Sequence, residues 1–236
     1  MRPIIVWGVL TVLTCLPANA GALEDGQAAA EHGDYATALK LWRPQADAKN
    51  SDAQFSIGTL YEKGHGVTQD YRQAIKWYRL AAQQGNPKAN TVLGSMYRNG
   101  LGVARNYKQA VKFYQPAAAA GDPLAEYDLG LMYQMGQGVA QNDEEAARWF
   151  RRAAEQGIAE AQTDLGVMYA LGNGVPQDYV RAHMWLSLAT DASDLDVKRR
   201  GAAERDNVAA QMTADQVKSA QELALRCRQS KFKQCN

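Results

Sequence analysis

Three histidines, one glycine-rich loop and one carboxylate pair are the groups that could do chemistry. A metal site would need His32, His65 and His183, but none lies within a helical turn of another or near a cysteine in the sequence. The segment Gly64-His65-Gly66 could cradle a phosphate, but it follows a predicted helix and recurs four times, which is typical of a structural loop. Glu144-Glu145 begins a predicted helix, where negative charge is favourable, so we interpret this pair as capping. The sequence therefore predicts no catalytic residue, no metal site and no cofactor.

The first twenty residues have the pattern of a secretory signal peptide. Arg2 supplies the positive start, Ile4–Leu16 is an uncharged and mostly apolar run, and Ala18 and Ala20 are small. Because this run is too short to span ~30 Å of hydrocarbon, we expect cleavage after Ala20 and a periplasmic or secreted chain without a membrane span. Two alternatives stay open, namely an uncleaved N-terminal anchor and a lipid attached to Cys15.

Cys227 and Cys235 are the two cysteines of the mature chain, and an even number in an oxidising compartment favours a disulfide. Eight residues of continuous helix would place the two Cα atoms about 12 Å apart, whereas a disulfide needs them within roughly 7 Å. We therefore predict that the last helix ends near Arg228 and that the chain folds back through Ser230–Lys233. Two free thiols are the alternative.

The charge balance argues against a nucleic-acid partner. The chain has 26 Lys and Arg against 25 Asp and Glu, and removing residues 1–20 takes away Arg2 alone among them. A neutral mature chain has no basic field to attract nucleic acid, so we interpret Lys198-Arg199-Arg200 as a solvated helical face.

The strongest pattern is a repeat with a period of 36 residues and no gap over four units. Each unit carries the motif Ala-x-x-x-Leu/Ile-Gly-x-x-Tyr, then a Gly-x-Gly-Val loop, then an aromatic position that we expect in the core. The motif occupies Ala53–Tyr61, Ala89–Tyr97, Ala125–Tyr133 and Ala161–Tyr169, and the aromatic position is Trp77, Phe113, Trp149 and Trp185.

Each unit predicts two helices. Ala53, Ile57 and Leu60 form one apolar stripe of the first helix. Gly58 and its equivalents cost the helix about 1 kcal/mol relative to alanine, which indicates that the second helix presses against bare backbone there. The predicted N-caps of the second helices are Asp70, Asn106, Asn142 and Asp178, and Gln73, Gln109 and Glu145 predict capping boxes.

The repeats define the domain organisation. The four 36-residue repeats occupy residues 51–192. Because Asp34–Trp42 lines up with Asp70–Tyr78, residues 21–50 predict an N-terminal capping hairpin. Residues 193–236 predict two longer C-terminal capping helices that contain the disulfide. Such ends are needed because a repeat array would otherwise expose an apolar face.

These motifs resemble the Sel1-like repeat (SLR) family, a branch of the tetratricopeptide-like helical repeats. The resemblance covers Asp34 to about Ala192, and the double-glycine loop distinguishes it from the tetratricopeptide unit. It implies an all-α, right-handed α/α solenoid of about twelve helices, with the first helix of each repeat on the concave side. It also implies a scaffold or adaptor for other proteins.

Positions that vary among the four units are the candidates for recognition. On each first helix, the face opposite the apolar stripe takes positions i, i+4 and i+7, and its chemistry changes from charged and polar in units one and two to apolar in three and four. Aromatic and arginine side chains there are the types that carry binding energy. The alternative is that these positions vary because no partner contacts them. The predicted groove residues are Phe55, Thr59, Glu62, Thr91, Ser95, Arg98, Tyr127, Leu131, Gln134, Thr163, Val167 and Ala170.

We therefore expect an exported, non-catalytic scaffold or adaptor that binds a peptide or protein segment in the concave groove. Envelope signalling, envelope assembly and host interaction are the processes that the resemblance suggests. The alternatives are a cell-wall-active hydrolase and a membrane-retained component of envelope assembly. A hydrolase would need converging acid, base or metal groups, and Glu62 and Arg98 alone do not supply such a set.

Overall fold

The computed structural model describes residues 19–232 and Cys235, and the predicted signal segment lies outside them except for Asn19 and Ala20. Residues 19–232 form twelve α-helices joined by turns. The helices are α1 (Asn19–Glu31), α2 (Tyr35–Asp47), α3 (Ser51–Lys63), α4 (Tyr71–Gln83), α5 (Pro87–Asn99), α6 (Tyr107–Ala119), α7 (Pro123–Met135), α8 (Asp143–Ala154), α9 (Ala159–Leu171), α10 (Tyr179–Ala189), α11 (Leu195–Ala209) and α12 (Ala214–Gln229).

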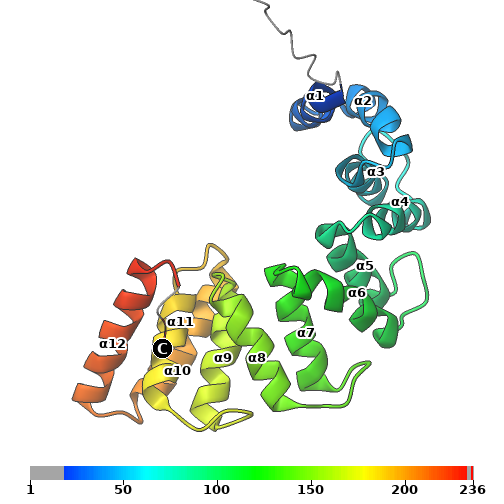
Figure 1. The fold of residues 1–236 in the computed structure, drawn as a ribbon. Helices are drawn as coiled ribbons and strands as arrows, with labels where there is room; N and C mark the ends of the chain where they lie inside the picture. The colour runs from blue at the N-terminus through cyan, green and yellow to red at the C-terminus, as the bar shows by residue number, and fades with distance from the viewer. Residues whose placement is uncertain (1–18, 233–234, 236) are drawn as a thin grey trace, which may run out of the picture.

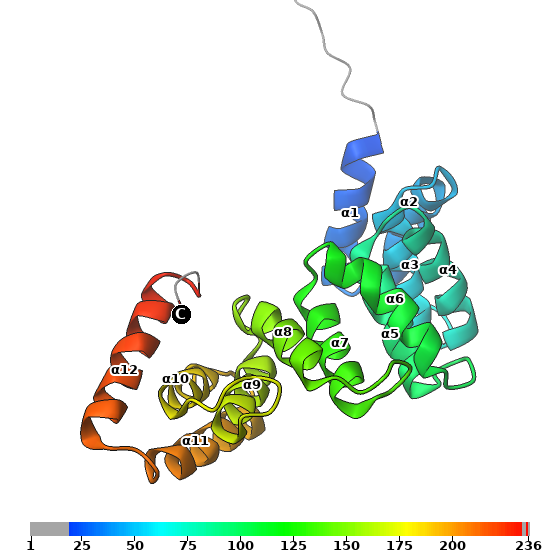
Figure 2. The same cartoon turned by 60° about the horizontal axis from the view of Figure 1, so that its bottom comes forward.

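The helices stack in chain order into a curved array (Figures 1 and 2). The first helices α3, α5, α7 and α9 pack on the second helices α4, α6, α8 and α10 of the same repeats, and each of α4, α6 and α8 also packs on the next first helix. In Figure 1, α1, α3 and α5 lie on the inside of the curve and α2, α4 and α6 on the outside. Direct contact of α5 with α7 agrees with this inner position. The prediction of an all-α solenoid of about twelve helices is confirmed.

A glycine in each first helix receives the core side chain of its second helix. A Cβ added at Gly94 would lie 2.5 Å from the Tyr114 ring, and one at Gly58 would lie 2.7 Å from the Tyr78 ring. No side chain fits into such a gap, so the second helix does press against bare backbone, as the sequence predicts. The other two pairs are Gly130 with Phe150 and Gly166 with Leu186.

The second glycine of each loop brings neighbouring repeats together. Gly102 has φ +70°, and a Cβ there would lie 2.6 Å from Tyr71 Cβ, at the start of the preceding second helix. Glycine alone combines this left-handed backbone with so close an approach. The equivalent contacts are Gly66 with Tyr35, Gly138 with Tyr107 and Gly174 with Asp143.

The predicted N-caps form, but the predicted capping boxes do not close in the repeats. Asp70 Oδ1 accepts the Gln73 backbone N–H at 3.1 Å, and the three equivalent residues cap in the same way. Within residues 19–232, both halves of a capping box are present at Thr213 and Gln216. In repeat three, Glu145 instead accepts a bond from Arg148, at 2.6 Å, which occupies the carboxylate on the solvent side.

The expected aromatic core is displaced by one residue. The deeply buried ring is Tyr78, Tyr114 or Phe150, whereas Trp77 and its equivalents in repeats two and three are only half-buried. The Arg43 guanidinium lies over the Trp77 ring, 5.0 Å from its centroid. Trp185 is the exception and is buried, because α9, α11 and α12 all pack on its helix α10.

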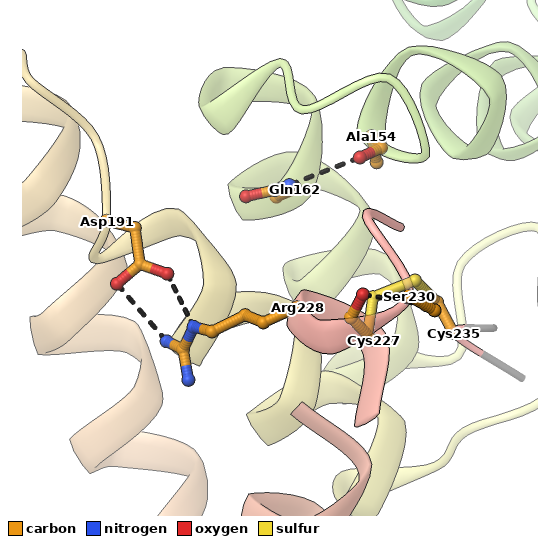
Figure 3. The surroundings of a disulfide bond; sticks show 7 residues. All are labelled: Ala154, Gln162, Asp191, Cys227, Arg228, Ser230 and Cys235. Atoms are coloured by element: carbon orange, nitrogen blue, oxygen red, sulfur yellow. Dashed lines mark hydrogen bonds and ion pairs between the residues drawn. A yellow bond between two sulfur atoms is a disulfide. The ribbon is translucent and has the colours of Figure 1, made fainter. Parts of the chain in front are cut away.

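The C-terminal helices close the array, and a disulfide fixes their end (Figure 3). Helix α12 ends at Gln229, and Lys231 and Phe232 take positive φ angles that turn the chain back. The sulfur atoms of Cys227 and Cys235 are bonded, with their Cα atoms 4.6 Å apart. Both cysteines are buried, and Phe232 packs against the same apolar cluster.

The contact between Gly94 and Tyr114 gives a stability prediction. Alanine normally favours a helix over glycine by about 1 kcal/mol, but Gly94→Ala should lower the free energy of unfolding by about 1–3 kcal/mol because the ring must move. In a Tyr114→Ala background, the same change should instead stabilise the protein by about 1 kcal/mol. Urea unfolding followed by circular dichroism measures all four proteins. A stabilising Gly94→Ala in the otherwise unchanged chain would contradict the packing contact.

Candidate binding groove

The inner face carries two hollows, one lined by two of the predicted groove residues and the other by four. The α1–α3 hollow, of about 300 Å³, is lined by Phe55 and Thr59 together with Tyr35 and Trp42. Phe55 also packs on the buried ring of Tyr78, with ring centroids 5.4 Å apart. Phe55 therefore both supports the repeat and borders the hollow.

The α3–α7 hollow, of about 270 Å³, is built from three repeats. Glu62 of α3, Ser95 of α5 and Tyr127 of α7 line it. Its other lining residues are Thr91, Val92, Met96, Leu101, Leu124 and Asp128. The Tyr78 hydroxyl donates a hydrogen bond to Glu62 Oε2, and burial raises the pKa of that phenol well above its usual range. The phenol therefore stays protonated and holds the Glu62 carboxylate in place.

The guanidinium of Arg98 is not free to bind another protein, because it is paired within the solenoid. Its Nη1 lies 2.5 Å from Asp128 Oδ1, which joins α5 to α7 across 30 residues of sequence. Burial raises the pKa of the Asp128 carboxyl above its usual value, and the charge of Arg98 offsets part of that effect. This ion pair links repeats two and three, so replacing Arg98 would disturb the solenoid as well as the groove.

Tyr127 is part of a second polar link between repeats. Its hydroxyl donates to Asp164 Oδ2 at 3.1 Å, and Arg200 of α11 binds Asp164 Oδ1 at 2.7 Å. All three residues of the basic run are exposed; Arg200 pairs with Asp164 between helices, and Arg199 lies 3.8 Å from Asp196 of its own helix.

The remaining predicted residues differ in accessibility. Thr163 has no exposed surface and bonds to Ala159 O of its own helix, and Thr91 is nearly as buried. Thr163 is therefore unavailable as a contact residue, whereas Thr91 still borders the α3–α7 hollow. Half-buried positions are held by Leu131 and Gln134 on α7 and by Val167 and Ala170 on α9.

Exposed apolar side chains on the first helices were missed by the sequence reasoning. Met135 is 57% exposed, Leu171 is 62% exposed and Leu124 is 56% exposed. A signal was present in the sequence, because Met135 and Leu171 follow Leu131 and Val167 by one helical turn. Together these side chains extend the groove surface toward repeats three and four.

The other candidate chemical groups have structural surroundings. The His65 ring stacks on Tyr35 at 4.5 Å, and His183 is buried, which together with Arg205 lowers the pKa of its imidazole. In the described part of the chain, no three His, Cys, Asp or Glu side chains are grouped to hold a metal ion. A separate finding is that none of the described helices is long and apolar enough to cross a membrane.

Comparison with known proteins identifies the repeat. The family model for the Sel1 repeat matches residues 51–86, 87–122, 123–158 and 159–194. A Sel1 repeat protein from Oxalobacter formigenes is 32% identical, with a TM-score of 0.70 over 76% of this chain and 75% of that one. A protective antigen with an SLR fold from uropathogenic Escherichia coli, c5321, is 29% identical with a TM-score of 0.57 over 92% of this chain and 53% of the antigen. The present chain thus spans about half of that antigen. A search of curated proteins finds no match to the present chain.

The Arg98–Asp128 pair predicts a pH-dependent defect. Burial raises the pKa of Asp128 in the folded state above its usual value of 3.8, so ionising this carboxyl costs stability. The free energy of unfolding therefore falls as the pH rises from 3.8 through the raised pKa of the folded state. Arg98→Ala should enlarge this loss, to about 1–3 kcal/mol at neutral pH, and leave a smaller defect at about pH 4. Urea unfolding at both pH values measures the difference.

Two further variants control that measurement. Adding Asp128→Asn to Arg98→Ala should recover most of the lost stability at neutral pH, because no buried carboxylate is left unpaired. Arg148→Ala breaks an exposed pair with Glu145 and should cost under about 1 kcal/mol. Equal defects for Arg98→Ala at the two pH values would show that the ion pair does not cause the loss.

Proposed function

We propose, since the chain belongs to the Sel1 repeat family, that it is an exported scaffold whose inner groove binds a peptide or protein segment. Sel1 repeats generally act as non-catalytic scaffolds for protein–protein interaction. The groove is the surface formed by the accessible predicted positions on α3, α5, α7 and α9, together with Leu124, Met135 and Leu171.

The observation that carries this proposal is the exposure of Met135 and Leu171 at equivalent positions of neighbouring repeats. Large apolar side chains that gather on one face of a soluble protein commonly mark an interaction site. In repeats one and two the equivalent residues are Lys63 and Asn99. The stack therefore does not require an apolar side chain at this position, which leaves recognition as its role in repeats three and four.

The carboxylates of the groove are not arranged as a catalytic pair. Asp128 is bound by Arg98, and Glu62 accepts a hydrogen bond from Tyr78. A typical glycoside hydrolase, the kind that would act on cell-wall glycan, needs one protonated and one ionised carboxyl free to reach the substrate. These contacts support a binding groove over a cell-wall-active enzyme.

Two features support export. The N-terminal segment has the composition of a cleavable signal, and Cys227 and Cys235 lie in bonding position in the structure. Disulfides persist in oxidising compartments such as the bacterial periplasm. A scaffold in the periplasm or outside the cell is the setting that fits both features, with envelope signalling, envelope assembly and host interaction as its candidate processes.

Peptide selection tests the groove. Peptides selected from a random display library on the purified protein should bind the Met135→Ser/Leu171→Ser variant at least about tenfold more weakly, a loss of about 1.4 kcal/mol, because their apolar contacts are removed. The Leu80→Ser/Leu225→Ser variant is the matched control, since it removes two exposed leucines from α4 and α12. Fluorescence anisotropy gives the affinities, and equal binding to both variants would contradict the groove.

Intact-mass analysis of the protein recovered from its native envelope tests export and oxidation. We expect an N-terminus at Gly21 and a mass lower by two hydrogen atoms than that of the reduced chain, because the disulfide forms after transfer. A retained N-terminal segment, or a chain that alkylates at Cys227 and Cys235 without reduction, would contradict the proposal.

A further inference from the structure

The α3–α7 hollow is small and belongs to the groove proposed above. Its volume is about 270 Å³, below the range of about 300–1,000 Å³ that encloses a drug-sized ligand. A pocket of this size on a groove suits a single side chain of a bound segment. The chemistry of its lining therefore indicates which side chain fits.

The ionisable lining of the hollow is acidic. Glu62 and Asp128 are its only charged lining residues. Arg98 neutralises Asp128, whereas the Glu62 carboxylate pairs with no cation within the described residues and accepts a hydrogen bond from the Tyr78 hydroxyl. One uncompensated negative charge is therefore left at the α3 side of the hollow.

Several of the other lining residues are apolar. They include Val92 of α5, Leu101 of the following loop and Leu124 of α7, and Leu124 is exposed. Lysine and arginine combine a long alkyl stem with a charged head, and they pack the stem on apolar surface while the head reaches a polar group. An apolar side chain would instead bury the Glu62 carboxylate with the Tyr78 hydroxyl as its partner and no cation, at a cost that a cation avoids, and an acidic side chain would be repelled.

We infer that the α3–α7 hollow receives a lysine or arginine side chain of the bound segment, with Glu62 as the carboxylate that pairs with it. Leu124 and Met135 are exposed near the two ends of α7, Leu131 between them is half-buried, and Leu171 is exposed at the end of α9. The segment therefore carries apolar side chains beside the basic residue, on the side that faces repeats three and four. This inference rests on the proposed function, because it specifies the ligand of the same groove.

The experiment uses the peptides selected on the purified full-length mature protein. We expect Lys or Arg to be enriched at one position beside apolar residues. Glu62→Gln should lower the affinity for the selected peptides at least about tenfold, because the amide keeps the hydrogen bond with Tyr78 and loses the negative charge. Glu160→Gln is the matched control, since it removes an exposed carboxylate of α9 outside the hollow. Thermal unfolding of both variants shows that the fold is kept.

A change in the peptide provides a second readout that does not depend on the variant. Replacing the enriched lysine by norleucine keeps the alkyl stem and removes the ammonium group, so binding to the unchanged protein should fall by a similar factor. In the Glu62→Gln variant the same replacement should have little further effect, because the charge pair is already lost.

Two other outcomes separate this inference from the proposed function. Peptides that lose affinity with Met135→Ser/Leu171→Ser, but show no basic enrichment or no response to Glu62→Gln, would overturn the basic-residue pocket and leave the groove standing. Failure to select any peptide, or selection of peptides that bind every variant equally, would overturn both.

Discussion

The structure depends on the contact between a glycine of each first helix and a large side chain of its second helix. Tyr78, Tyr114, Phe150 and Leu186 fill this position, and each lies where the glycine would otherwise carry a Cβ. The glycine weakens its own helix, but the buried ring gains apolar contact that outweighs the loss. Because the distance between the two helices is set in this way in every repeat, the loop glycines can also meet the preceding repeat at one spacing.

Polar contacts between repeats meet one requirement in different ways. The last carbonyls of a second helix lack helical donors. Gln162 donates to Ala154 O (Figure 3), and Gln54 donates to Ala46 O in the same manner. In repeat three the equivalent residue is Glu126, whose carboxylate cannot donate a hydrogen bond to a carbonyl. Arg152 binds both Glu126 and Ala118 O and so replaces the missing bond, although burial still raises the pKa of the Glu126 carboxyl.

The repeating features could be predicted from the sequence because they are local or recur four times. The helix pairs, the glycine contacts, the caps such as Asp70 and the turn that brings Cys235 back to Cys227 are of this kind. The Arg98–Asp128 pair could not be predicted, because its register depends on how two helices 30 residues apart are rotated. The burial of Thr163 and the half-exposure of Trp77 likewise depend on the curvature of the stack and on which neighbours cover each helix.

These contacts explain why the two sides of each first helix have different roles. One side of each helix is committed to the second helix through glycine, alanine and leucine, so it cannot change without loss of packing. The inner side is constrained only where neighbouring repeats pair across it, as Arg98 does with Asp128 and Tyr127 with Asp164. These pairs leave the Glu62 carboxylate without a cation, and they leave the side chains of Leu124, Met135 and Leu171 exposed. We therefore propose that recognition uses these groups, because Arg98, Asp128, Tyr127 and Asp164 already have partners within the solenoid.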